Sequence, residues 1–493
     1  MHRHGARTGM VAALVVSLAL WGLAAAAQAQ LVASVSATPT GQPLPAGFLG
    51  VSLEYRALHL YAGDDLGAVD PVLVRLLAQL APGQAPVLRI GGDSTDGTWW
   101  PMRGVIPPGG IYYRLSQGWL RTTRALAGAL GARLILGVNL AAGRPALAAA
   151  EARALLAGIG SQYIEALEIG NEPDLYGAAG WYRLKGRTVF ARSRRYDLGS
   201  FIGDFSRWRE ALPSAPLAGP AFSGSSWMGG LSRFLSAEPG LAVVTYHRYP
   251  LRGCLTKPRA PGYASIANLL ADGSASGLAR GVAGYAAVAH AHGLPFRIGE
   301  MNSASCGGRK GTSDTFASAL WVLDTLFNLA SVGVDGVNIH SLPGASYELF
   351  SFSRGHGGAW RATVHPEYYG MLLFAQAFPV GAQLLPVSAP AGPVKVWATE
   401  GTDGHVRVVA INKSTSSRYT FQLQVPGAAQ GTLEYLLARS AAATGGVTLG
   451  GQSFGAQTTT GALPGPQSAT PIAASAGSYS ISLPPASAAL LTQ

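Results

Sequence analysis

Cysteine is nearly absent from this chain of 493 residues, which contains only Cys254 and Cys306. Two lone cysteines cannot by themselves hold a zinc ion, and no His/Cys spacing nearby completes a four-ligand set. The sequence therefore predicts no zinc site.

Charged residues are also scarce, at 12% of the chain, and long basic blocks are absent although the formal net charge is +11. The basic fragments are short ones such as Arg192-Ser193-Arg194-Arg195. A basic protein can bind nucleic acid, an anionic surface or an acidic polysaccharide. Because the Lys and Arg residues are scattered, we expect no nucleic-acid partner and favour an acidic carbohydrate.

Long apolar runs are confined to the N-terminus. A basic start precedes an apolar stretch at 10–27, and Ala27-Gln28-Ala29 gives a small-x-small cleavage pattern. The sequence predicts a signal peptide over residues 1–29 and a secreted or periplasmic mature protein that begins at Gln30. The alternative is a membrane anchor, since the stretch approaches the length of a spanning helix. No basic stop follows the cleavage site, which favours cleavage and no stable membrane insertion afterwards.

Eight short apolar runs alternate with helical patterns such as 71–80 and 315–333. Runs that are apolar throughout are typical of parallel strands covered on both faces. The pattern predicts a (β/α)8 TIM barrel over residues 47–375. The expected strands are 48–55, 87–92, 133–140, 164–171, 216–220, 242–249, 296–302 and 336–341.

The composition changes after residue 375, where Ser, Thr, Gly and Pro become more frequent and alternating apolar runs appear. Alternation predicts antiparallel strands, so residues 376–493 are expected to form a β-sandwich domain. The N-terminal segment 30–46 contains a strand-like run that we expect to join this sandwich, and 440–477 is expected to be partly loop. The expected strands of the domain are 394–400, 405–412, 419–425 and 478–483.

Two glutamates end two of the expected barrel strands. Glu172 follows the strand at 164–171 in the string GNEP, and Glu300 lies in the strand at 296–302. The carboxyl ends of barrel strands form the reactive face, so both carboxylates are expected on one rim. Acetal hydrolysis needs such a pair, one to protonate the leaving oxygen and one to attack or to activate water. The structural alternative, a helix cap or an arginine partner, explains one glutamate better than two.

Other polar residues end neighbouring strands. Arg89 lies in the strand at 87–92, and His247 and Tyr249 lie at the end of 242–249. A flanking arginine and tyrosine would keep one carboxylate ionised, while burial would raise the pKa of the other. We expect Arg89 and His247 to support the pair. For His247, a substrate contact and a purely positioning role are equally consistent with the sequence.

Longer strings of residues sharpen this interpretation. The order of GNEP and IGE resembles the clan A glycoside hydrolases. With the longer strings, the chain resembles glycoside hydrolase family 79, which contains β-glucuronidases and heparanases. The resemblance covers the barrel and, more loosely, the C-terminal region. The strings are IGEMNSASCGG (298–308), LRIGGDSTD (88–96), TYHRYP (245–250) and HPEYYGMLLF (365–374).

The resemblance implies a retaining double displacement. Glu172 would be the general acid/base and Glu300 the nucleophile, with Tyr249 supporting the nucleophile. Asn171 would bond the sugar 2-hydroxyl, and Asp96 would bind further hydroxyls of a glucuronate. These two carboxylates suffice for the reaction, so neither a metal nor a cofactor is expected.

The resemblance also implies how the substrate carboxylate is held. Tyr368 would contact it, together with the backbone N–H groups of Gly307 and Gly308, since a nest of amides can bind a carboxylate without a fixed positive charge. The sequence departs from the family at Ser305, where some members carry a tyrosine. That departure affects carboxylate recognition but not the reaction.

The two cysteines follow neighbouring strands of the expected barrel. In an oxidising compartment one disulfide between Cys254 and Cys306 is expected, and it would brace the rim beside the nucleophile. The alternative is two buried thiols.

These features predict an exported retaining β-glucuronidase that acts on a carbohydrate containing glucuronic acid. The alternatives are an endo-β-glucuronidase of the heparanase kind, a catalytically silent carbohydrate-binding relative, and a xylosidase or arabinofuranosidase. Pocket shape separates exo from endo action, and the lack of clustered Lys/Arg tilts the prediction toward exo. Both glutamates are present, which argues against a silent relative.

Overall fold

The computed structural model describes residues 31–64 and 68–493. The predicted signal peptide at 1–29 and its cleavage before Gln30 lie outside the described residues. Within the described part, none of the helices combines the length and the apolarity that a membrane crossing requires.

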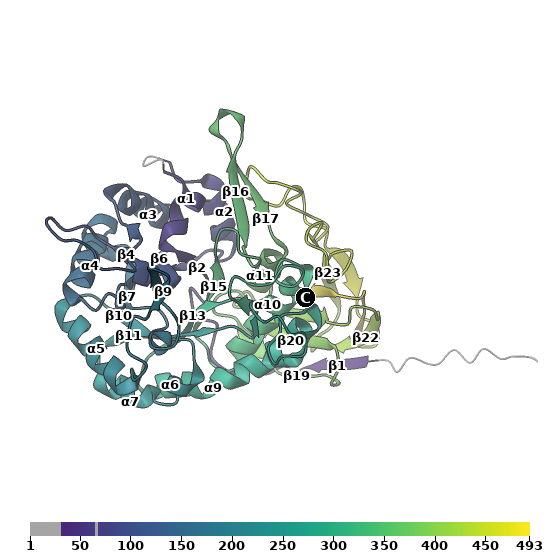
Figure 1. Cartoon of the computed structure of the whole chain (residues 1–493). Helices are drawn as coiled ribbons and strands as arrows, with labels where there is room; N and C mark the ends of the chain where they lie inside the picture. Colours follow the sequence, from purple (N-terminus) through teal and green to yellow (C-terminus); the bar gives the residue numbers. More distant parts are fainter. Residues whose placement is uncertain (1–30, 65–67) are drawn as a thin grey trace, which may run out of the picture. The chain divides into compact units, whose positions relative to one another are not determined.

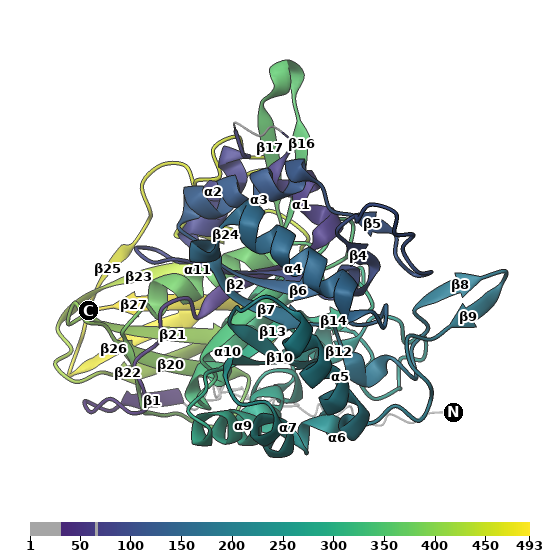
Figure 2. The ribbon, with the colours of Figure 1, turned by 90° about the vertical axis from the view of Figure 1, so that its left-hand side faces the viewer.

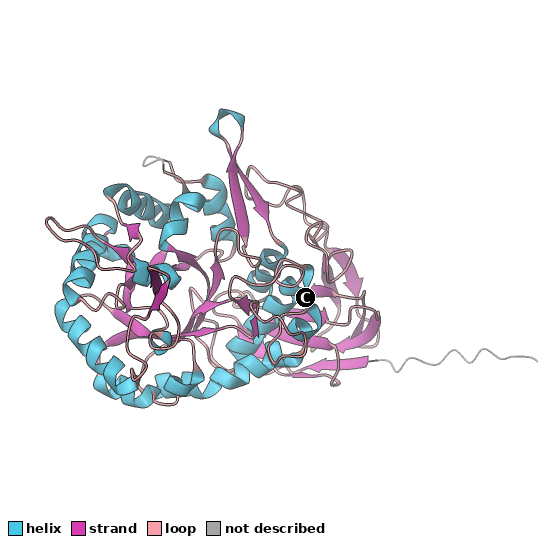
Figure 3. Cartoon of the chain, viewed as in Figure 1, coloured by secondary structure: helices cyan, strands magenta, loops and turns pink. Residues whose placement is uncertain are grey.

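Eight parallel strands close into a barrel in the order β10-β11-β13-β15-β2-β3-β6-β7, ringed by helices (Figures 1 and 3). All eight predicted barrel strands are confirmed, with ends that differ by one or two residues. The strands are β2 (Leu49–Glu54), β3 (Val87–Gly91), β6 (Arg133–Val138), β7 (Ile164–Ile169), β10 (Leu217–Phe222), β11 (Leu241–Arg248), β13 (Phe296–Met301) and β15 (Gly336–Ser341).

Local signals set the ends of the surrounding helices. Asp70 caps α2 (Pro71–Gln79) by accepting a hydrogen bond from Val72 N–H, and Ser116 caps α3 (Gln117–Leu130) in the same way. Gly131 ends α3 in the left-handed conformation that favours glycine. The remaining helices are α1 (Leu58–Ala62), α4 (Pro145–Ile159), α5 (Leu198–Ala211), α6 (Ser225–Met228), α7 (Leu231–Ala237), α8 (Ile266–Leu270), α9 (Ser276–Ala291), α10 (Phe316–Ser331) and α11 (Pro366–Ala377).

The C-terminal region forms two sheets, of order β19-β1-β22-β26 and β18-β20-β21-β27-β23-β24, with β25 paired to β23 (Figure 2). Strand β1 pairs in parallel with β22, so residues Leu31–Val35 belong to this domain. The strands are β1 (Leu31–Val35), β18 (Gln383–Leu385), β19 (Val387–Ser388), β20 (Val394–Glu400), β21 (Val406–Asn412), β22 (Tyr419–Gln424), β23 (Gln430–Leu437), β24 (Thr448–Leu449), β25 (Thr470–Ala473), β26 (Ser478–Leu483) and β27 (Ser487–Thr492).

The two longest strands of this domain that were not predicted are β23 and β27, and the short strands β18, β19, β24 and β25 were not predicted either. β27 runs between β21 and β23, and five of its six residues are buried. A strand covered on both faces lacks the alternation that reveals a half-exposed strand. The stretch 440–477, expected to be partly loop, contains only the short strands β24 and β25.

Helix α10 joins the barrel to the sandwich. Asp324 of α10 accepts a hydrogen bond from Trp397 Nε1 of β20 at 3.0 Å and pairs with the buried Lys413 ammonium. The rings of Phe327 and Trp397 stack with centroids 5.5 Å apart. This double contact explains why α10 is buried along nearly its whole length.

Further short strands lie in the loops that follow the carboxyl ends of the barrel strands, where the site is expected. A hairpin of β8 (Tyr182–Leu184) and β9 (Arg187–Val189) follows β7, and one of β16 (Phe350–Arg354) and β17 (Trp360–Val364) follows β15 (Figure 2). The other pairs are β4 (Thr98–Trp99) with β5 (Tyr113–Arg114), and β12 (Leu251–Arg252) with β14 (Ala304–Ser305).

Candidate active site

Glu172 and Glu300 meet at the carboxyl ends of β7 and β13. One carboxylate oxygen of each and one ring nitrogen of His247, from β11, all lie within 4.8 Å of one another. In the barrel order β7, β10, β11, β13, these residues come from one continuous sector of the wall. The structure thus brings together the two glutamates on which the sequence prediction depends.

The backbone bends sharply at the string GNEP. Gly170 has φ +77°, and a side chain there would lie 2.9 Å from Leu140. Glu172 itself has φ 48° and ψ 51°, a left-handed conformation that residues with side chains rarely adopt. Its N–H donates to Ala221 O at 3.0 Å, and Pro173 begins a short 3₁₀ turn. These contacts hold the Glu172 carboxylate at the strand end, and strain of this kind is typical of functional sites.

Glu300 is buried and is held as an anion. Arg89 Nη1 donates to its Oε2 at 2.7 Å, and the Tyr249 hydroxyl donates to its Oε1 at 2.7 Å. Burial alone would raise the pKa of Glu300, but the positive charges of His340, His247 and Arg89 and the bond from Tyr249 together hold it well below its usual range. An ionised, oriented carboxylate is what a nucleophile requires.

Arg89 organises the floor of the site. Its guanidinium is fully buried and donates to Glu168 Oε2 at 2.7 Å and to Asn171 Oδ1 at 2.8 Å, besides its bond to Glu300. A guanidinium presents five donors in a fixed plane, so it can orient several acceptors at once. Arg89 therefore holds Glu300, the candidate nucleophile, and Asn171, which precedes the candidate acid/base, in fixed positions relative to each other.

His247 lies between the two glutamates. Its Nδ1 is 3.2 Å from Glu172 Oε1, and its ring is fully buried. Burial and the charge of Arg89 lower the pKa of His247, but Glu300 and Glu172 outweigh them and raise it. The residue is placed for the supporting role predicted from sequence.

The same cluster is the one group in the described chain that resembles a three-ligand metal set. Both oxygens of Glu300 already accept hydrogen bonds, from Arg89 and Tyr249. A cation there would also lie against the Arg89 guanidinium and be repelled by it. The arrangement therefore suits proton transfer and nucleophilic attack better than metal binding.

Asp96 does not take the position predicted for it. It is buried, its Oδ1 accepts from Leu140 N and Ala141 N at 2.9 Å each, and its Oδ2 accepts from Tyr176 OH at 2.5 Å and Asn171 N at 3.2 Å. With four donors its acceptor capacity is occupied. Asp96 therefore fixes the loop that carries Asn171, and its carboxylate oxygens are engaged within the protein.

Tyr368 is a second correction. It lies in α11, is fully buried, packs against Phe350 and Phe454, and donates its hydroxyl to Leu76 O at 2.7 Å. The hydroxyl therefore bonds a barrel helix, away from the glutamates. The motif around Tyr368 belongs to the core.

A different tyrosine, Tyr347, stands beside the predicted glycines. A side chain added at Gly308 would come within 3.0 Å of the Tyr347 ring, and Ser346 N–H donates to Gly307 O at 2.8 Å. The Tyr347 ring lies 6.3 Å from that of Tyr249, and burial and the charge of Glu300 raise its pKa. Tyr347, and not Tyr368, is therefore the tyrosine that the structure places beside the glycine loop.

The glycine loop has an available donor. Gly307 and Gly308 both have positive φ, at 77° and 76°. Gly308 N–H makes a long 3.4 Å bond to Ser305 O, whereas no acceptor for Gly307 N–H is found among the described residues. Of the two amides predicted to hold a carboxylate, that of Gly307 is free to do so.

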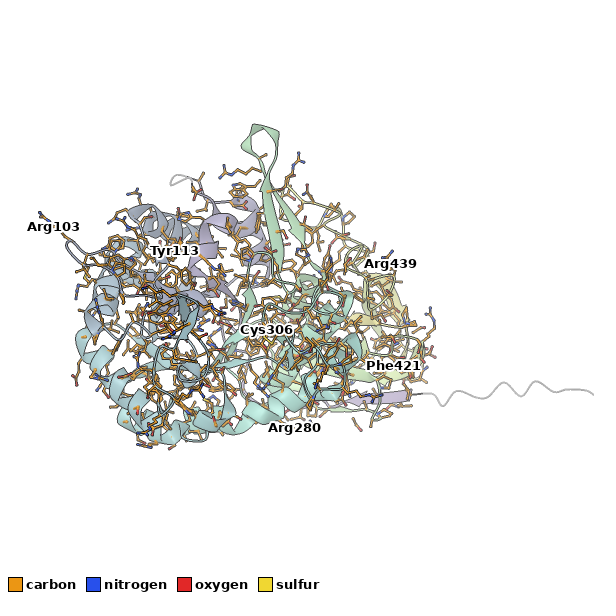
Figure 4. All side chains as sticks on the ribbon, viewed as in Figure 1. Arg103, Tyr113, Arg280, Cys306, Phe421 and Arg439 are labelled. Carbon is orange, nitrogen blue, oxygen red and sulfur yellow. A yellow bond between two sulfur atoms is a disulfide. The ribbon has the colours of Figure 1, made fainter. Side chains whose placement is uncertain are left out.

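Cys254 and Cys306 are joined in a disulfide, with Cα atoms 5.7 Å apart (Figure 4). Beyond the ends of β11 and β13 the chain pairs again as β12 and β14, matching Leu251 with Ala304. The disulfide lies just beyond this pair of strands. It links Cys254, in the loop after β11, to Cys306, the residue before Gly307.

Two residues near the glutamates were passed over in the sequence. Glu168 is a buried glutamate inside β7, and a charge at a buried strand position signals a buried partner, here Arg89. Asp93 lies three residues before Asp96 in the same string, and it accepts a bond from Asn171 Nδ2 at 3.3 Å. Sequence spacing alone does not separate these two aspartates.

Comparison with known proteins agrees with this architecture. Residues 396–490 match the family model described as glycosyl hydrolase family 79 C-terminal beta domain. A curated relative, a β-glucuronidase of Aspergillus niger, is 27% identical over 186 residues, which cover 33% of this chain and 34% of the relative. The chain thus spans about a third of the length of the curated relative it matches.

Solved structures show the same fold at low identity. A 4-O-α-L-rhamnosyl-β-D-glucuronidase of Fusarium oxysporum 12S matches with a TM-score of 0.72 and 19% identity, covering 93% of this chain and 100% of that one. A GH51 arabinofuranosidase of Xanthomonas axonopodis pv. citri matches with a TM-score of 0.65 and 15% identity, covering 94% and 100%. Together the comparisons confirm the resemblance to glycoside hydrolase family 79.

Proposed function

We propose, from the chain's resemblance to glycoside hydrolase family 79, that it is a retaining β-glucuronidase acting on β-D-glucuronides of glycans or glycoconjugates. The observation that carries this proposal is the placement of Glu172 and Glu300 within 4.8 Å, with only Glu300 braced by Arg89 and Tyr249. Carboxyl groups of retaining enzymes lie about 5–5.5 Å apart, whereas inverting enzymes leave room for a water between them.

In the first step, the Glu300 carboxylate attacks the anomeric carbon and forms a glycosyl ester. The Glu172 carboxyl gives its proton to the departing glycosidic oxygen, and the bond between the anomeric carbon and that oxygen breaks. A lone pair of the Glu300 oxygen forms the new bond, and the electron pair of the broken bond stays on the glycosidic oxygen, which departs with the proton as a neutral alcohol.

In the second step, Glu172, now ionised, takes a proton from water, and the water oxygen attacks the anomeric carbon. The ester bond to Glu300 breaks and the carboxylate is regenerated. Two inversions give net retention. His247, 3.2 Å from Glu172, supports its change of charge between the two steps.

We place the group that selects a uronate, a binding site for the substrate carboxylate, at the glycine loop near Gly307. Its N–H is free, Tyr347 stands beside the adjoining Gly308, and the disulfide at Cys306 fixes the loop. Glu54 ends β2 and Asp93 follows β3, and these strands lie two and three places beyond β13 in the barrel order. Carboxyl groups bind a substrate carboxylate less well than free amide donors do, so we place the substrate carboxylate at the glycine loop.

The proposal is tested by a panel of aryl β-glucuronide, aryl β-glucoside, aryl α-L-arabinofuranoside and heparan sulfate. We expect turnover of the glucuronide at a kcat/KM about 10- to 150-fold above that of the glucoside, since losing a charged hydrogen bond costs about 1.5–3 kcal/mol. Cleavage of heparan sulfate alone identifies an endo enzyme, and preference for the arabinofuranoside contradicts the proposal. Binding without any turnover identifies a silent carbohydrate-binding protein.

We also propose that the protein is exported, on the strength of the N-terminal segment 1–29 and the disulfide. Disulfides persist in oxidising compartments. N-terminal sequencing of protein recovered from the producing cells tests this, with Gln30 as the expected first residue. Recovery of the uncleaved chain in the cell membrane contradicts it.

A further inference from the structure

Asp93 occupies an unusual place at the end of β3. Residues Ser94 to Gly97, which follow it in the same 3₁₀ segment, are all buried, and Asp93 alone is exposed. Its neighbour Asn171 is 6% exposed and Glu300 7%. Asp93 is therefore the part of this loop that faces outward at the edge of the site.

The backbone under Asp93 is fixed by Glu54. Asp93 N–H donates to Glu54 Oε1 at 3.1 Å and Ser94 N–H donates to Glu54 Oε2 at 2.7 Å. Gly92 has φ +65°, and a side chain there would meet the Glu54 carboxylate at 2.5 Å. The Asp93 carboxyl is thus presented from a rigid turn, as a substrate contact requires.

The Asp93 carboxyl can form further hydrogen bonds. Its Oδ1 accepts from Asn171 Nδ2 at 3.3 Å, and among the described residues no second donor reaches its carboxyl oxygens. Asp96, by contrast, is saturated by four donors. Of the two aspartates, only Asp93 therefore has carboxyl oxygens that remain available to a ligand.

Asn171 indicates where the sugar ring would bind. Its Oδ1 is occupied by Arg89, and one of the two hydrogens of its amide nitrogen goes to Asp93. The second hydrogen remains for the substrate, where the family resemblance implies the 2-hydroxyl. Asp93 lies beside that amide, so the pair matches two adjacent ring hydroxyls.

We propose that Asp93 contacts the sugar ring at the 3-hydroxyl, next to the 2-hydroxyl that Asn171 contacts. This contact makes the enzyme select a ring that carries a 3-hydroxyl. This inference rests on the proposed function. It places the contact on the acidic side of the site, away from the glycine loop that faces the substrate carboxylate.

Neighbouring charges agree with this placement. Partial desolvation and the charges of Glu54, Glu300, Glu172 and Asp96 raise the pKa of Asp93 to about 8. At neutral pH the carboxyl is therefore largely protonated, and it can both donate to and accept from a hydroxyl.

The test compares an aryl β-glucuronide with its 3-deoxy and 2-deoxy analogues. In the wild-type enzyme, loss of the 3-hydroxyl lowers kcat/KM by about 10- to 100-fold, the range of a hydrogen bond to a charged or strongly polar group. In Asp93→Ala the ratio of parent to 3-deoxy substrate falls to within about threefold, while the ratio for the 2-deoxy analogue stays at its wild-type value. Asp93→Leu, closer in size, repeats the measurement if the smaller side chain perturbs the turn.

Asp96→Asn is the matched control. It removes a buried acceptor, so its melting temperature falls, but its 3-deoxy ratio stays at the wild-type value. An unchanged 3-deoxy ratio in both Asp93 variants overturns the inference and leaves the proposed function standing. If the wild-type enzyme does not turn over the parent glucuronide at all, the proposed function fails and the inference fails with it.

Discussion

A carboxylate oxygen of Glu172 and one of Glu300 lie within 4.8 Å of each other, although 127 intervening residues separate them along the chain. The two side chains differ in what surrounds them. Glu300 receives Arg89 and Tyr249, whereas Glu172 faces His247. Glu300 is therefore held ionised by partners that Glu172 lacks, and this asymmetry supports the two roles proposed for them.

The acid/base role predicts chemical rescue of Glu172→Ala. With an aryl glucuronide that has a good leaving group, the first step needs little acid, so glycosylation survives and the second step becomes limiting. Azide does not need a general base, and we expect it to restore turnover that the substitution lowers by about 10²–10⁴-fold. The product to be detected by NMR is β-glucuronosyl azide.

Glu300→Ala is the control for that experiment. Azide there replaces the nucleophile, so any product has the α configuration. Formation of the α-azide by Glu172→Ala, or no rescue at all, contradicts the acid/base assignment.

The Arg89 hub predicts a large effect on stability as well as on activity. Arg89→Ala leaves Glu168 and Glu300 buried without their positive partner, and we expect the free energy of unfolding to fall by about 3–5 kcal/mol. Turnover falls with it, because the nucleophile loses its orientation. Chemical denaturation measures the first effect and aryl glucuronide kinetics the second.

Arg121→Ala is the matched surface control, since Arg121 is exposed on α3. Its stability is expected to stay within about 0.5 kcal/mol of the wild type. Equal effects of the two substitutions would show that Arg89 does not hold a buried network.

The fold was predictable because barrel strands are apolar runs at regular intervals, and their ends mark the reactive rim. The same logic located Glu172 and Glu300. It failed for β27, whose residues are buried on both faces and show no alternation. Such a strand differs from any other short apolar segment only through its partners.

The remaining errors concern residues that only three-dimensional packing separates. Asp93 and Asp96 share one string, but Glu54 turns one outward while Tyr176 and the loop amides enclose the other. Tyr368 lies in a distinctive motif but its hydroxyl bonds Leu76, and Tyr347 reaches the glycine loop from a stretch with no clear pattern. Side-chain direction at loop positions is not encoded by spacing alone.

Asp93 predicts a pH-dependent difference in stability. Its pKa is raised to about 8 in the folded protein, so the folded state binds this proton more tightly than the unfolded state does. That contribution is fully present below the ordinary pKa of an aspartate and is lost as the pH rises through 8. Asp93→Asn removes the titration, so its melting temperature relative to the wild type is expected to rise between pH 5 and pH 9. Parallel melting curves across that range would contradict the assignment.

The disulfide predicts a coupled loss of stability and affinity. Replacing Cys254 and Cys306 together by Ser frees a loop closed over 52 residues, and we expect unfolding to become easier by about 2–4 kcal/mol. Because Cys306 precedes Gly307, KM for the glucuronide should rise more than kcat falls. Thermal unfolding and steady-state kinetics of the double variant check both, and a reduced wild-type sample should behave in the same way. An unchanged KM would show that the bond does not brace the carboxylate-binding loop.

The most direct test of the two-glutamate mechanism is the trapping of its covalent intermediate. An aryl 2-deoxy-2-fluoro-β-glucuronide with a good leaving group slows both steps, and the second more strongly, so the glycosyl-enzyme accumulates. Proteolysis and mass spectrometry of the inactivated protein then locate the label. The account predicts one fluoroglucuronosyl ester per chain on Glu300, at full occupancy, and none in Glu300→Ala. A label on Glu172, or inactivation without a label on either glutamate, would contradict it.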